Sequence, residues 1–456
     1  MKVLYRNNVQ QNHNKRPTSM KKLIFPLMLC ALFLNRAEAQ EKKVEEKKTE
    51  ATAATPATPK PQPAFGAVIG GFVRTDYIWD SRKNVNVREN HLNLYPTDVV
   101  KDAKGNDLNA VPQSNFLSIV SRINLKITGP DAFGAKTSAF FEGDFFGNTE
   151  GSIGLFRIRH ANASLDWAKT KLTLGQSWYP QFVAECFPGV ANFSTGILFN
   201  PFGWVSQAKV TRSLSKSTSF ALTVYKDREF GAVSATGVGN EASFNSVLPT
   251  LHGNLQYKNA KFLLGVGAEY RSLQPRTTIS TGTPAVTVEN SGTVNSVTIN
   301  TYAKYTGKKA TIKAYGLLGQ NVTQLVMLGG YVGYNSTTDP VTEIFKPTKT
   351  NAFWFELMSN NAKVAPALFV GYTVNNGASV DGKTAYARGV TIEKRTVKDV
   401  MRAASRIDFK SGKMRFSPEL EYTTANWGTS NKAGALSGDL TKVNNIRFLF
   451  STAYTF

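Results

Sequence analysis

Two arginines separated by one apolar residue are the strongest chemical signal in this sequence. In the stretch "GLFRIRHANASLDW", Arg157 and Arg159 share one parity, and Phe156 and Ile158 share the other. Successive side chains of a β-strand point to opposite faces, so a strand here turns both guanidinium groups toward one face. Such a pair in a water-filled space attracts anionic solutes, and we predict that Arg157 and Arg159 contact a solute.

The second half of the same stretch changes parity. Its apolar residues Leu165 and Trp167 have odd positions, whereas Phe156 and Ile158 have even ones. Either a bulge lies between the two halves, or the lower half of the strand changes face. The sequence leaves both alternatives open.

Further charged residues have the parity opposite to the apolar face of a predicted strand. The predicted pore-lining cations are Arg122, Lys126, Arg157, Arg159, Arg402, Arg406, Arg415 and Arg447, and the predicted pore-lining acids are Glu142, Asp144, Glu419 and Glu421. A wall with more cations than acids raises the local anion concentration, which predicts anion preference. The alternative is that arginines and glutamates pair across the space and only brace the wall.

Catalysis has no comparable signal. His91, His160 and His252 have no serine or aspartate partner at a diagnostic spacing, and the sequence contains no GxSxG motif. It also lacks a phosphate-binding glycine loop and a zinc-ligand spacing, and Cys186 alone is not a metal site. We therefore predict a protein that is not an enzyme and that uses no cofactor or metal.

The charged residues lie in alternating runs of roughly ten residues, the length of a tilted membrane-spanning strand. In "FLSIVSRINLKIT" the pattern predicts one apolar face made of Leu117, Ile119, Ile123, Leu125 and Ile127. The mean hydropathy is -0.24, and no run in the body of the chain approaches the roughly 20 apolar residues of a membrane helix. This excludes a helical membrane protein but not a barrel, because alternation averages to a neutral hydropathy.

The links between these runs alternate in length. The short links are "GPDAFG", "WAKTK", "SLSKST", "KNAK", "TGKKA", "SNNAK" and "KSGK", and the long links lie near residues 81–114, 146–153, 178–204, 229–247, 273–294, 320–346, 375–396 and 428–441. Seven short and eight long links join sixteen strands. Outer-membrane barrels combine an even strand count with short periplasmic turns and long external loops. We therefore predict an all-β fold, a transmembrane antiparallel up-and-down β-barrel of about 16 strands with both termini in the periplasm.

The sequence ends in "NNIRFLFSTAYTF", where Phe450, Tyr454 and Phe456 share one parity. A closing strand that ends on an outward aromatic residue is typical of the signal that outer-membrane barrels present to the barrel assembly machinery. We predict that role for these three residues. We also expect the last strand to pair with the first, because a closed barrel leaves no unpaired edge.

The link at 178–204 differs from the other long links because it is aromatic and carries one charge, Glu185. An exposed external loop should be more polar, so we predict that this link folds into the barrel and narrows it. Glu185, Phe187, Phe193 and Phe199 would then lie at the constriction. The alternative is a loop at a subunit interface, which would also be apolar.

The first 64 residues have the composition of targeting and linking segments. A basic start at Met20, the apolar run "LIFPLMLCALFL" and the motif "AEA" predict an N-terminal extension and secretory signal peptide over 1–39, with translation starting at Met1 or Met20. Residues 40–64 are charged and then Pro-rich, which predicts a periplasmic linker before a barrel at 65–456.

In an exported protein, a net charge of +22 indicates outer-membrane lipid, lipopolysaccharide or anionic solutes as partners, not nucleic acid. Cleavage leaves only Cys186, so no intramolecular disulfide is expected.

Three stretches carry a resemblance to a known family. "GFVRTDYIWDSR", "SRINLKITGPDAFGAKTSAFFEGDFFG" and "FRIRHANASLDW" with the following "TKLTLGQSWYPQF" resemble the DcaP-like outer-membrane porins, most clearly over residues 70–182. The resemblance implies a homotrimer of sixteen-stranded barrels that passes small, often negatively charged solutes, with a periplasmic N-terminal extension. It also implies that Arg157 and Arg159 belong to the basic wall of the pore.

Together these patterns predict an outer-membrane porin of a Gram-negative bacterium. It would be a passive diffusion channel for small hydrophilic solutes, with a preference for anions. The alternative from a different functional class is a surface receptor or adhesin that acts through its long external loops, such as "RTTISTGTPAVTVENSGTVNSV".

Overall fold

The computed structural model describes residues 65–228, 233–237, 239–336 and 342–456. The predicted signal peptide at 1–39 and nearly all of the linker predicted at 40–64 lie outside the described residues. The barrel belongs to a compact unit that begins at Pro63. In the described part of the chain, no helix is both long enough and apolar enough to cross a membrane.

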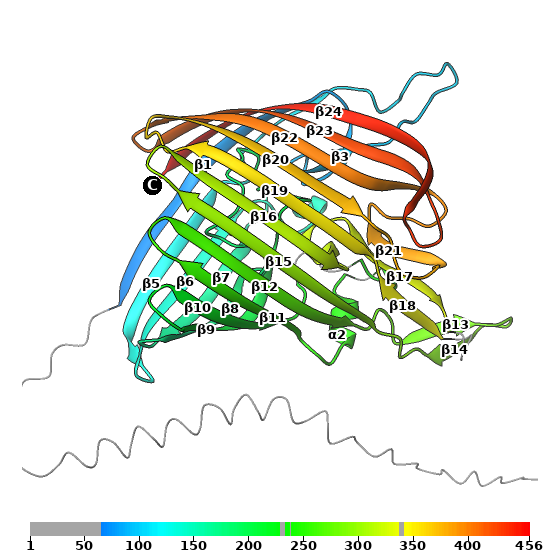
Figure 1. Ribbon diagram of the computed structural model, residues 1–456, viewed down its shortest axis with the longest axis horizontal. Helices are drawn as coiled ribbons and strands as arrows, with labels where there is room; N and C mark the ends of the chain where they lie inside the picture. The colour runs from blue at the N-terminus through cyan, green and yellow to red at the C-terminus, as the bar shows by residue number, and fades with distance from the viewer. Residues whose placement is uncertain (1–64, 229–232, 238, 337–341) are drawn as a thin grey trace, which may run out of the picture. The chain divides into compact units, whose positions relative to one another are not determined.

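Sixteen barrel strands, each antiparallel to its neighbours, form a closed wall (Figure 1). In chain order they are β1 (Gly66–Asp80), β4 (Gln113–Leu117) with β5 (Arg122–Ala132) as one interrupted strand, β6 (Ala135–Asp144), β7 (Arg157–Asp166), β8 (Thr170–Trp178), β9 (Trp204–Ser213), β10 (Thr218–Tyr225), β11 (Thr250–Lys258), β12 (Phe262–Leu273), β15 (Val294–Thr306), β16 (Ala310–Gln320), β19 (Lys349–Ser359), β20 (Val364–Asn375), β22 (Arg395–Ser411), β23 (Met414–Ser430) and β24 (Leu436–Thr455). The first strand closes the wall by pairing with the last, from Phe72 opposite Thr455 to Asp80 opposite Arg447. The predicted fold class and strand number are confirmed.

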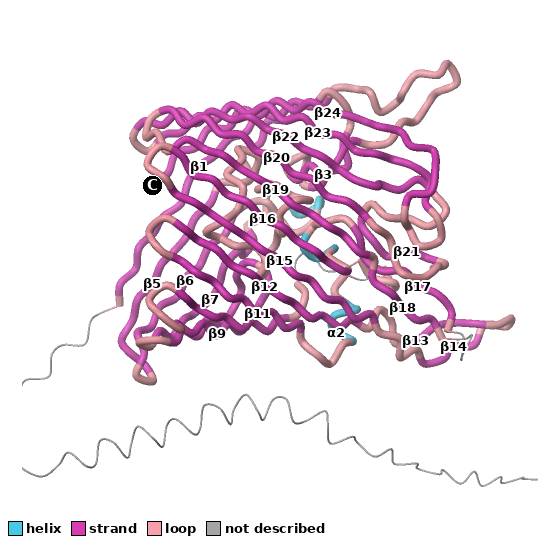
Figure 2. The backbone as a smooth tube through the Cα atoms, in the orientation of Figure 1, coloured by secondary structure: helices cyan, strands magenta, loops and turns pink. Residues whose placement is uncertain are grey.

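Seven short turns gather at one end of the barrel and the long connections gather at the other (Figure 1). We call these ends the short-turn rim and the long-loop end. The connections contain β2 (Asn84–Val87), β3 (Leu92–Pro96), α2 (Glu241–Asn245), β13 (Thr278–Thr281), β14 (Val286–Glu289), β17 (Gly329–Asn335), β18 (Glu343–Pro347), β21 (Thr384–Arg388) and 3-10 turns at Glu150–Ser152 and Thr323–Leu325. Figure 2 shows that strands make the wall, whereas the helical turns lie in the connections.

The outer face of the wall is apolar because alternate residues of each strand point outward. On β12, Phe262, Leu264 and Val266 are each between 43% and 44% exposed. Their neighbours on the inner parity, Glu269 and Arg271, are buried inside the barrel. A belt of exposed apolar side chains around a closed sheet is the surface that a bilayer covers.

The second strand departs from the uninterrupted alternation expected for Phe116–Thr128. A turn at residues 118–121 divides it, and the pairing with β1 moves from Asp76 opposite Leu117 to Phe72 opposite Arg122. Because β1 advances four residues while the partner advances five, the extra residue reverses the face. Leu117 is therefore buried inside, and the prediction that it shares a face with Ile123 is wrong.

The extra residue is stabilised by a serine. The backbone N–H of Arg74 donates to Ser121 Oγ at 3.0 Å, and this hydroxyl donates to the carbonyl of Arg74 at 3.2 Å. The side chain thus occupies the place of the missing strand neighbour. The last predicted long link, 428–441, is also shorter than expected, because β23 continues to Ser430 and β24 begins at Leu436.

Candidate functional site

Residues 179–203 cross the inside of the barrel between the ends of β8 and β9, and we call this segment the constriction loop. Tyr315 of β16 donates its hydroxyl to the carbonyl of Gln181 at 3.0 Å. Lys313 of the same strand donates to the carbonyl of Phe187 at 3.0 Å. Because β16 is separated from β8 and β9 by several strands of the wall, these bonds require the loop to span the lumen.

Two wall carboxylates bind the backbone of the constriction loop. Glu356 accepts from the N–H of Gly189 at 2.9 and 3.0 Å, and Glu419 accepts from the N–H groups of Ala191 and Asn192 at 2.6 and 3.1 Å. Both glutamates are at most 2% exposed. Glu419, predicted to line the pore, therefore holds the loop instead of facing open solvent.

Aromatic side chains fill the space between the loop and the wall. Phe193 and Phe199 belong to a buried cluster that also contains Trp204 of β9 and Phe369 of β20. Phe187 stacks on Phe182 with ring centroids 5.3 Å apart. Of the four residues predicted at the constriction, Glu185 alone is a charged group, and it pairs with Lys258 at the short-turn rim. The loop is therefore fixed by packing as well as by hydrogen bonds.

The guanidinium groups of Arg157 and Arg159 lie inside the barrel and are buried under this aromatic cluster. Arg157 Nε is 2.7 Å from Asp144, and Arg159 Nε is 2.8 Å from Glu142. Both guanidinium groups lie over the ring of Trp204, at 4.7 and 4.2 Å from its centroid. They are only 3% and 1% exposed. The pair is thus shielded by carboxylates and rings, and Arg159 lines a cavity inside the barrel.

A bulge explains the change of parity along this strand. Glu142 of β6 pairs with His160, whereas the next residue, Gly143, pairs with Ile158. Two residues of β7, Arg159 and His160, therefore occupy one pairing position, and both are buried inside. Of the two alternatives left open by the sequence, the bulge is the one observed.

Arg402 holds two loops at once. Its Nη2 donates to the carbonyls of Asn93 and Leu94, each at 3.0 Å, and its Nη1 donates to Ile197 of the constriction loop at 3.5 Å. Glu421 lies 3.2 Å from Arg402 and accepts from the side-chain amide of Asn93 at 3.1 Å. This predicted pore-lining pair therefore stabilises the packing of loops against the wall.

Arg447 and Arg406 are covered in the same way. Arg447 forms a two-pronged ion pair with Asp80, with both distances at 2.8 Å, and donates to the carbonyl of Asn90 at 3.0 Å. Arg406 lies 3.6 Å from Glu356. Both arginines are at most 5% exposed, so the loops cover the part of the inner wall on which they lie. Parity predicts their inward direction, but the covering loops remove them from solvent.

A cavity of about 690 Å³ lies between the constriction loop and the short-turn rim. Its charged and titratable lining residues are Arg74, Arg122, Arg159, Arg415, Glu142 and His160, and its aromatic lining residues are Phe72, Phe140, Trp178, Phe182, Phe187, Phe193 and Phe202. A second cavity shares Phe72, Arg74 and Arg415 with it and reaches Lys410 and Lys413 at the rim. We call the two cavities together the basic chamber, since four arginines of the first face one acid.

Arg122 and Arg415 are the half-buried arginines of this chamber. Arg122 lies 3.5 Å from Glu142, whereas Arg415 makes no ion pair with the described residues. Lys126 is exposed and has the same parity as Arg122 on β5. Across residues 65–456, excluding the undescribed gaps, no group of His, Cys, Asp and Glu is arranged to hold a metal ion.

The first long connection also folds into the barrel, which the sequence analysis missed. Its β2–β3 hairpin buries Leu92, Leu94 and Tyr95, and His91 has no exposed surface. The His91 ring packs edge-on against Phe146, 5.9 Å between centroids, and burial lowers its pKa to about 4. The apolar run "LNLYP" in a charged connection was the available signal.

The three predicted assembly residues lie on the outer face of the closing strand. Phe450 pairs with Tyr77 and Tyr454 pairs with Val73 on β1. Phe456 exchanges backbone hydrogen bonds with Gly71, at 3.1 and 3.3 Å. Tyr454 and Phe456 are 48% and 47% exposed. Their role in assembly stays a prediction.

A closed sixteen-stranded barrel with an inward-folded loop is the fold of the outer-membrane porins. The chain is similar to the outer-membrane channel DcaP of Acinetobacter baumannii, at 16% identity and a TM-score of 0.60, covering 86% of this chain and 98% of that one. It is also similar to an anion-selective porin from Comamonas acidovorans (12% identity, TM-score 0.51, covering 86% and 100%) and to OmpT of Vibrio cholerae (11%, 0.50, covering 86% and 98%). No family model and no curated sequence matches this chain. At these identities the likeness defines the fold, and at that level it confirms the resemblance to DcaP-like porins.

Proposed function

We propose that this protein is an outer-membrane porin of a Gram-negative bacterium that passes small hydrophilic solutes and favours anions, and that it is not an enzyme. The observation that carries the proposal is the basic chamber, whose first cavity is lined by four arginines and one glutamate beneath a fixed constriction loop. Arg74 and Arg159 also pair with Asp76 and Asp144, whereas Arg415 makes no ion pair with the described residues. Fixed positive charge in a narrow, partly desolvated passage attracts anions and repels cations. The anion selectivity of the similar Comamonas acidovorans porin supports the same direction.

The membrane orientation follows from the asymmetry of the barrel ends. Outer-membrane barrels place short turns in the periplasm and long loops outside the cell. The proposal therefore puts the short-turn rim, Gly66 and Phe456 on the periplasmic side. It makes the basic chamber the inner part of the solute path. The sequence resemblance further supports a homotrimer as the working form.

The test is single-channel recording of the purified protein in a planar bilayer under a KCl gradient. Current steps with a reversal potential on the chloride side support the proposal. Arg415→Gln should shift that potential toward zero, because Arg415 is a chamber cation without an ion-pair partner among the described residues. Lys104→Gln, an exposed residue of the first long connection, is the matched control and should leave it unchanged.

Two other results would redirect the assignment. A reversal potential on the potassium side keeps the channel and overturns anion preference. An absence of steps from well-folded protein overturns the channel and favours the surface-receptor alternative.

A further inference from the structure

Lysines recur at one structural position around the short-turn rim. In five of the seven short turns, the residue directly before the returning strand is a lysine. These residues are Lys169, Lys261, Lys309, Lys363 and Lys413, and Lys216 and Lys308 lie in short turns as well. The seven turns themselves contain no acid, and the acids at the adjoining strand ends, Asp131 and Asp166, pair with Lys136 and Lys171. We call the five equivalent residues the rim lysines.

Backbone hydrogen bonds fix the rim lysines beside one another. The carbonyl of Lys309 accepts from Asn360 N–H at 2.9 Å, and the carbonyl of Lys363 accepts from Lys410 N–H at 2.8 Å. Lys261 and Lys413 make the equivalent bonds to the ends of the next strands, at 2.8 and 2.9 Å. Neighbouring turns are therefore tied into a belt, which holds the ammonium groups along one edge of the wall.

The rim lysines have no acidic partner in the described part of the chain. All five are exposed, and none lies within 4.0 Å of a described carboxylate. This contrasts with the inner wall, where nearly every arginine pairs with an acid. An unpaired row of cations at the edge of a membrane-facing wall is complementary to anionic headgroups.

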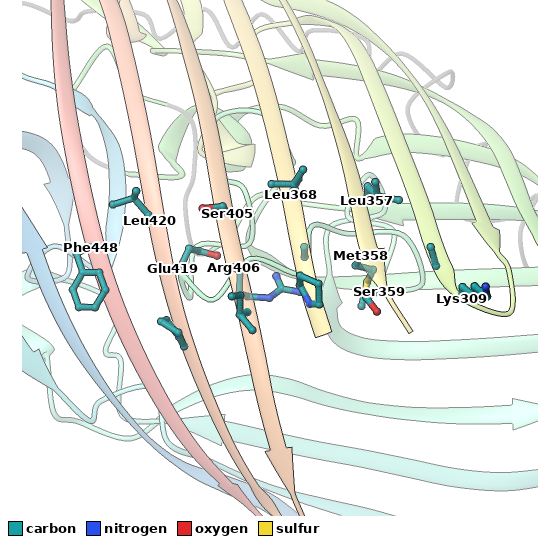
Figure 3. A pocket seen from close by; sticks show the side chains of 15 residues that line it. Lys309, Leu357, Met358, Ser359, Leu368, Ser405, Arg406, Glu419, Leu420 and Phe448 are labelled. Atoms are coloured by element: carbon teal, nitrogen blue, oxygen red, sulfur yellow. The ribbon is translucent and has the colours of Figure 1, made fainter. Parts of the chain in front are cut away.

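A dent on the outer face begins at one of these lysines. It has a volume of about 640 Å³ and is lined by Lys309, Leu357, Leu368, Leu420 and Phe448, among others (Figure 3). Direct pairing places Leu357, Leu368, Ser405, Leu420 and Phe448 in one row across β19, β20, β22, β23 and β24. Ser405 is the only small side chain of that row, and Pro366 and Pro418 lie beside it, so the row is hollow at its centre.

We propose that this part of the wall binds an anionic phospholipid, with the phosphate between the rim lysines Lys309 and Lys363 and an acyl chain in the dent. The apolar lining suits a hydrocarbon chain, and the Lys309 ammonium group at its end suits a phosphate. Lys363 lies in the neighbouring turn, whose Asn360 N–H donates to the carbonyl of Lys309. A second copy of this chain is a poorer occupant, because its rim would bring lysines against lysines. The inference needs only that the barrel lies in a bilayer, so it goes beyond the proposed transport function.

The test is native mass spectrometry of the full chain in detergent with equal amounts of phosphatidylglycerol and phosphatidylcholine of identical acyl chains. We expect preferential retention of phosphatidylglycerol. The double variant Lys309→Gln, Lys363→Gln should reduce the preference by about fivefold or more, the size expected for removing cations from an anionic lipid surface. Lys101→Gln with Lys104→Gln, exposed at the long-loop end, removes the same charge and should leave the preference intact.

A third variant tests the dent. Ser405→Leu fills the centre of the row and should lower the retention of both lipids equally. Equal retention of the two lipids by the unmodified chain, or an unchanged preference in the lysine double variant, overturns the proposal. If Ser405→Leu instead changes the oligomeric mass and leaves lipid retention unchanged, the dent is a subunit contact and the proposal fails. We expect the lysine double variant to keep the reversal potential of the unmodified protein. A loss of lipid preference in that variant then bears on the lipid site and not on the proposed ion selectivity.

Discussion

Buried arginines and glutamates connect the wall of this barrel to the loops inside it. Glu419 accepts two loop amides, and its partner residues lie 227 and 228 positions away in the sequence. A buried N–H without an acceptor costs about 1–3 kcal/mol, so each such contact is a large part of the stability of the loop. The same contacts keep the ionised groups away from the solute path.

We expect Glu419→Ala to loosen the constriction loop, because the amides of Ala191 and Asn192 lose their acceptor. Single-channel recordings should show larger and noisier currents while the barrel stays folded. Glu289→Ala, an exposed acid of β14, is the control and should conduct as the unmodified protein does. Quiet currents of unchanged size in Glu419→Ala would mean that packing alone holds the loop.

His91 should make the protein sensitive to acid. Burial lowers its pKa from about 6.5 to about 4, and neither ring nitrogen has a hydrogen-bond partner. The unfolded chain takes up a proton below pH 6.5 and the folded chain only below pH 4. The stability contributed by neutral His91 is therefore fully present above pH 6.5 and is lost as the pH falls toward 4, by about 3 kcal/mol.

Denaturant titrations between pH 7 and pH 4 measure this loss. His91→Phe keeps an aromatic ring beside Phe146 and Phe193 and removes the titrating group, so its stability should fall less steeply. Identical pH slopes for the two proteins would exclude His91 as the source.

The thiol of Cys186 should be unreactive in the folded protein. Its Sγ lies 3.5 Å from the carbonyl of Ala303, and burial raises its pKa to about 11. The nucleophilic thiolate is then scarce at pH 8, so maleimide labelling should be slow until the protein is unfolded. Labelling is measured in a Cys30→Ser background, so that Cys186 is the remaining cysteine. Glu185→Cys in the same background places an exposed thiol beside Cys186 and is the positive control. Rapid labelling of native Cys186 would contradict its burial.

At the scale of elements, the sequence predicts the strands better than the loops. Period-two alternation reports directly which face of a strand is apolar, so β12 and the closing strand were predictable residue by residue. The prediction of the outward face was wrong at Leu117. One inserted residue in the four-residue turn at 118–121 exchanges the inward and outward faces of the strand. The positions of the loops inside the lumen depend on contacts between residues remote in sequence, such as Arg402 and Asn93, which are 309 positions apart. No local pattern encodes such a contact, and this is why the cover over the predicted pore-lining arginines was missed.

We expect that the β2–β3 hairpin occupies part of the lumen and can be deleted without unfolding the barrel. Thr97 N–H donates to the carbonyl of Lys83 at 3.2 Å, so deletion of residues 84–96 with a two-glycine link joins positions that already adjoin. In that variant Arg447 retains its ion pair with Asp80, and Arg402 retains its ion pair with Glu421. We expect a folded barrel with a larger single-channel conductance. The control deletes 278–289, an exposed hairpin whose base is closed by a bond between Asn290 and Thr277. Equal conductances would show that the hairpin does not limit the path.

At the scale of the whole molecule, the fold depends on one closing contact between segments at opposite ends of the chain. β1 and β24 pair over nine positions, from Phe72 to Asp80. Closure satisfies the backbone groups of two strands that would otherwise be exposed edges, and an unpaired edge is not tolerated in a bilayer. A substitution that disrupts this contact therefore tests whether the barrel closes as described.

Gly71 lies at one end of this pairing, where β1 also pairs with β5 on its other side. A Cβ added there would be 2.2 Å from the carbonyl oxygen of Arg122 on β5 and 2.8 Å from the ring of Phe456, with which the Gly71 backbone exchanges hydrogen bonds. We expect Gly71→Val to prevent closure, so that the protein loses the heat-dependent mobility shift of a closed barrel on detergent gels. Gly438→Val, in β24 but with open space around its Cβ position, should keep the shift. A normal shift in Gly71→Val would mean that β1 pairs with β5 in another register, because no small displacement relieves an overlap with the backbone of Arg122.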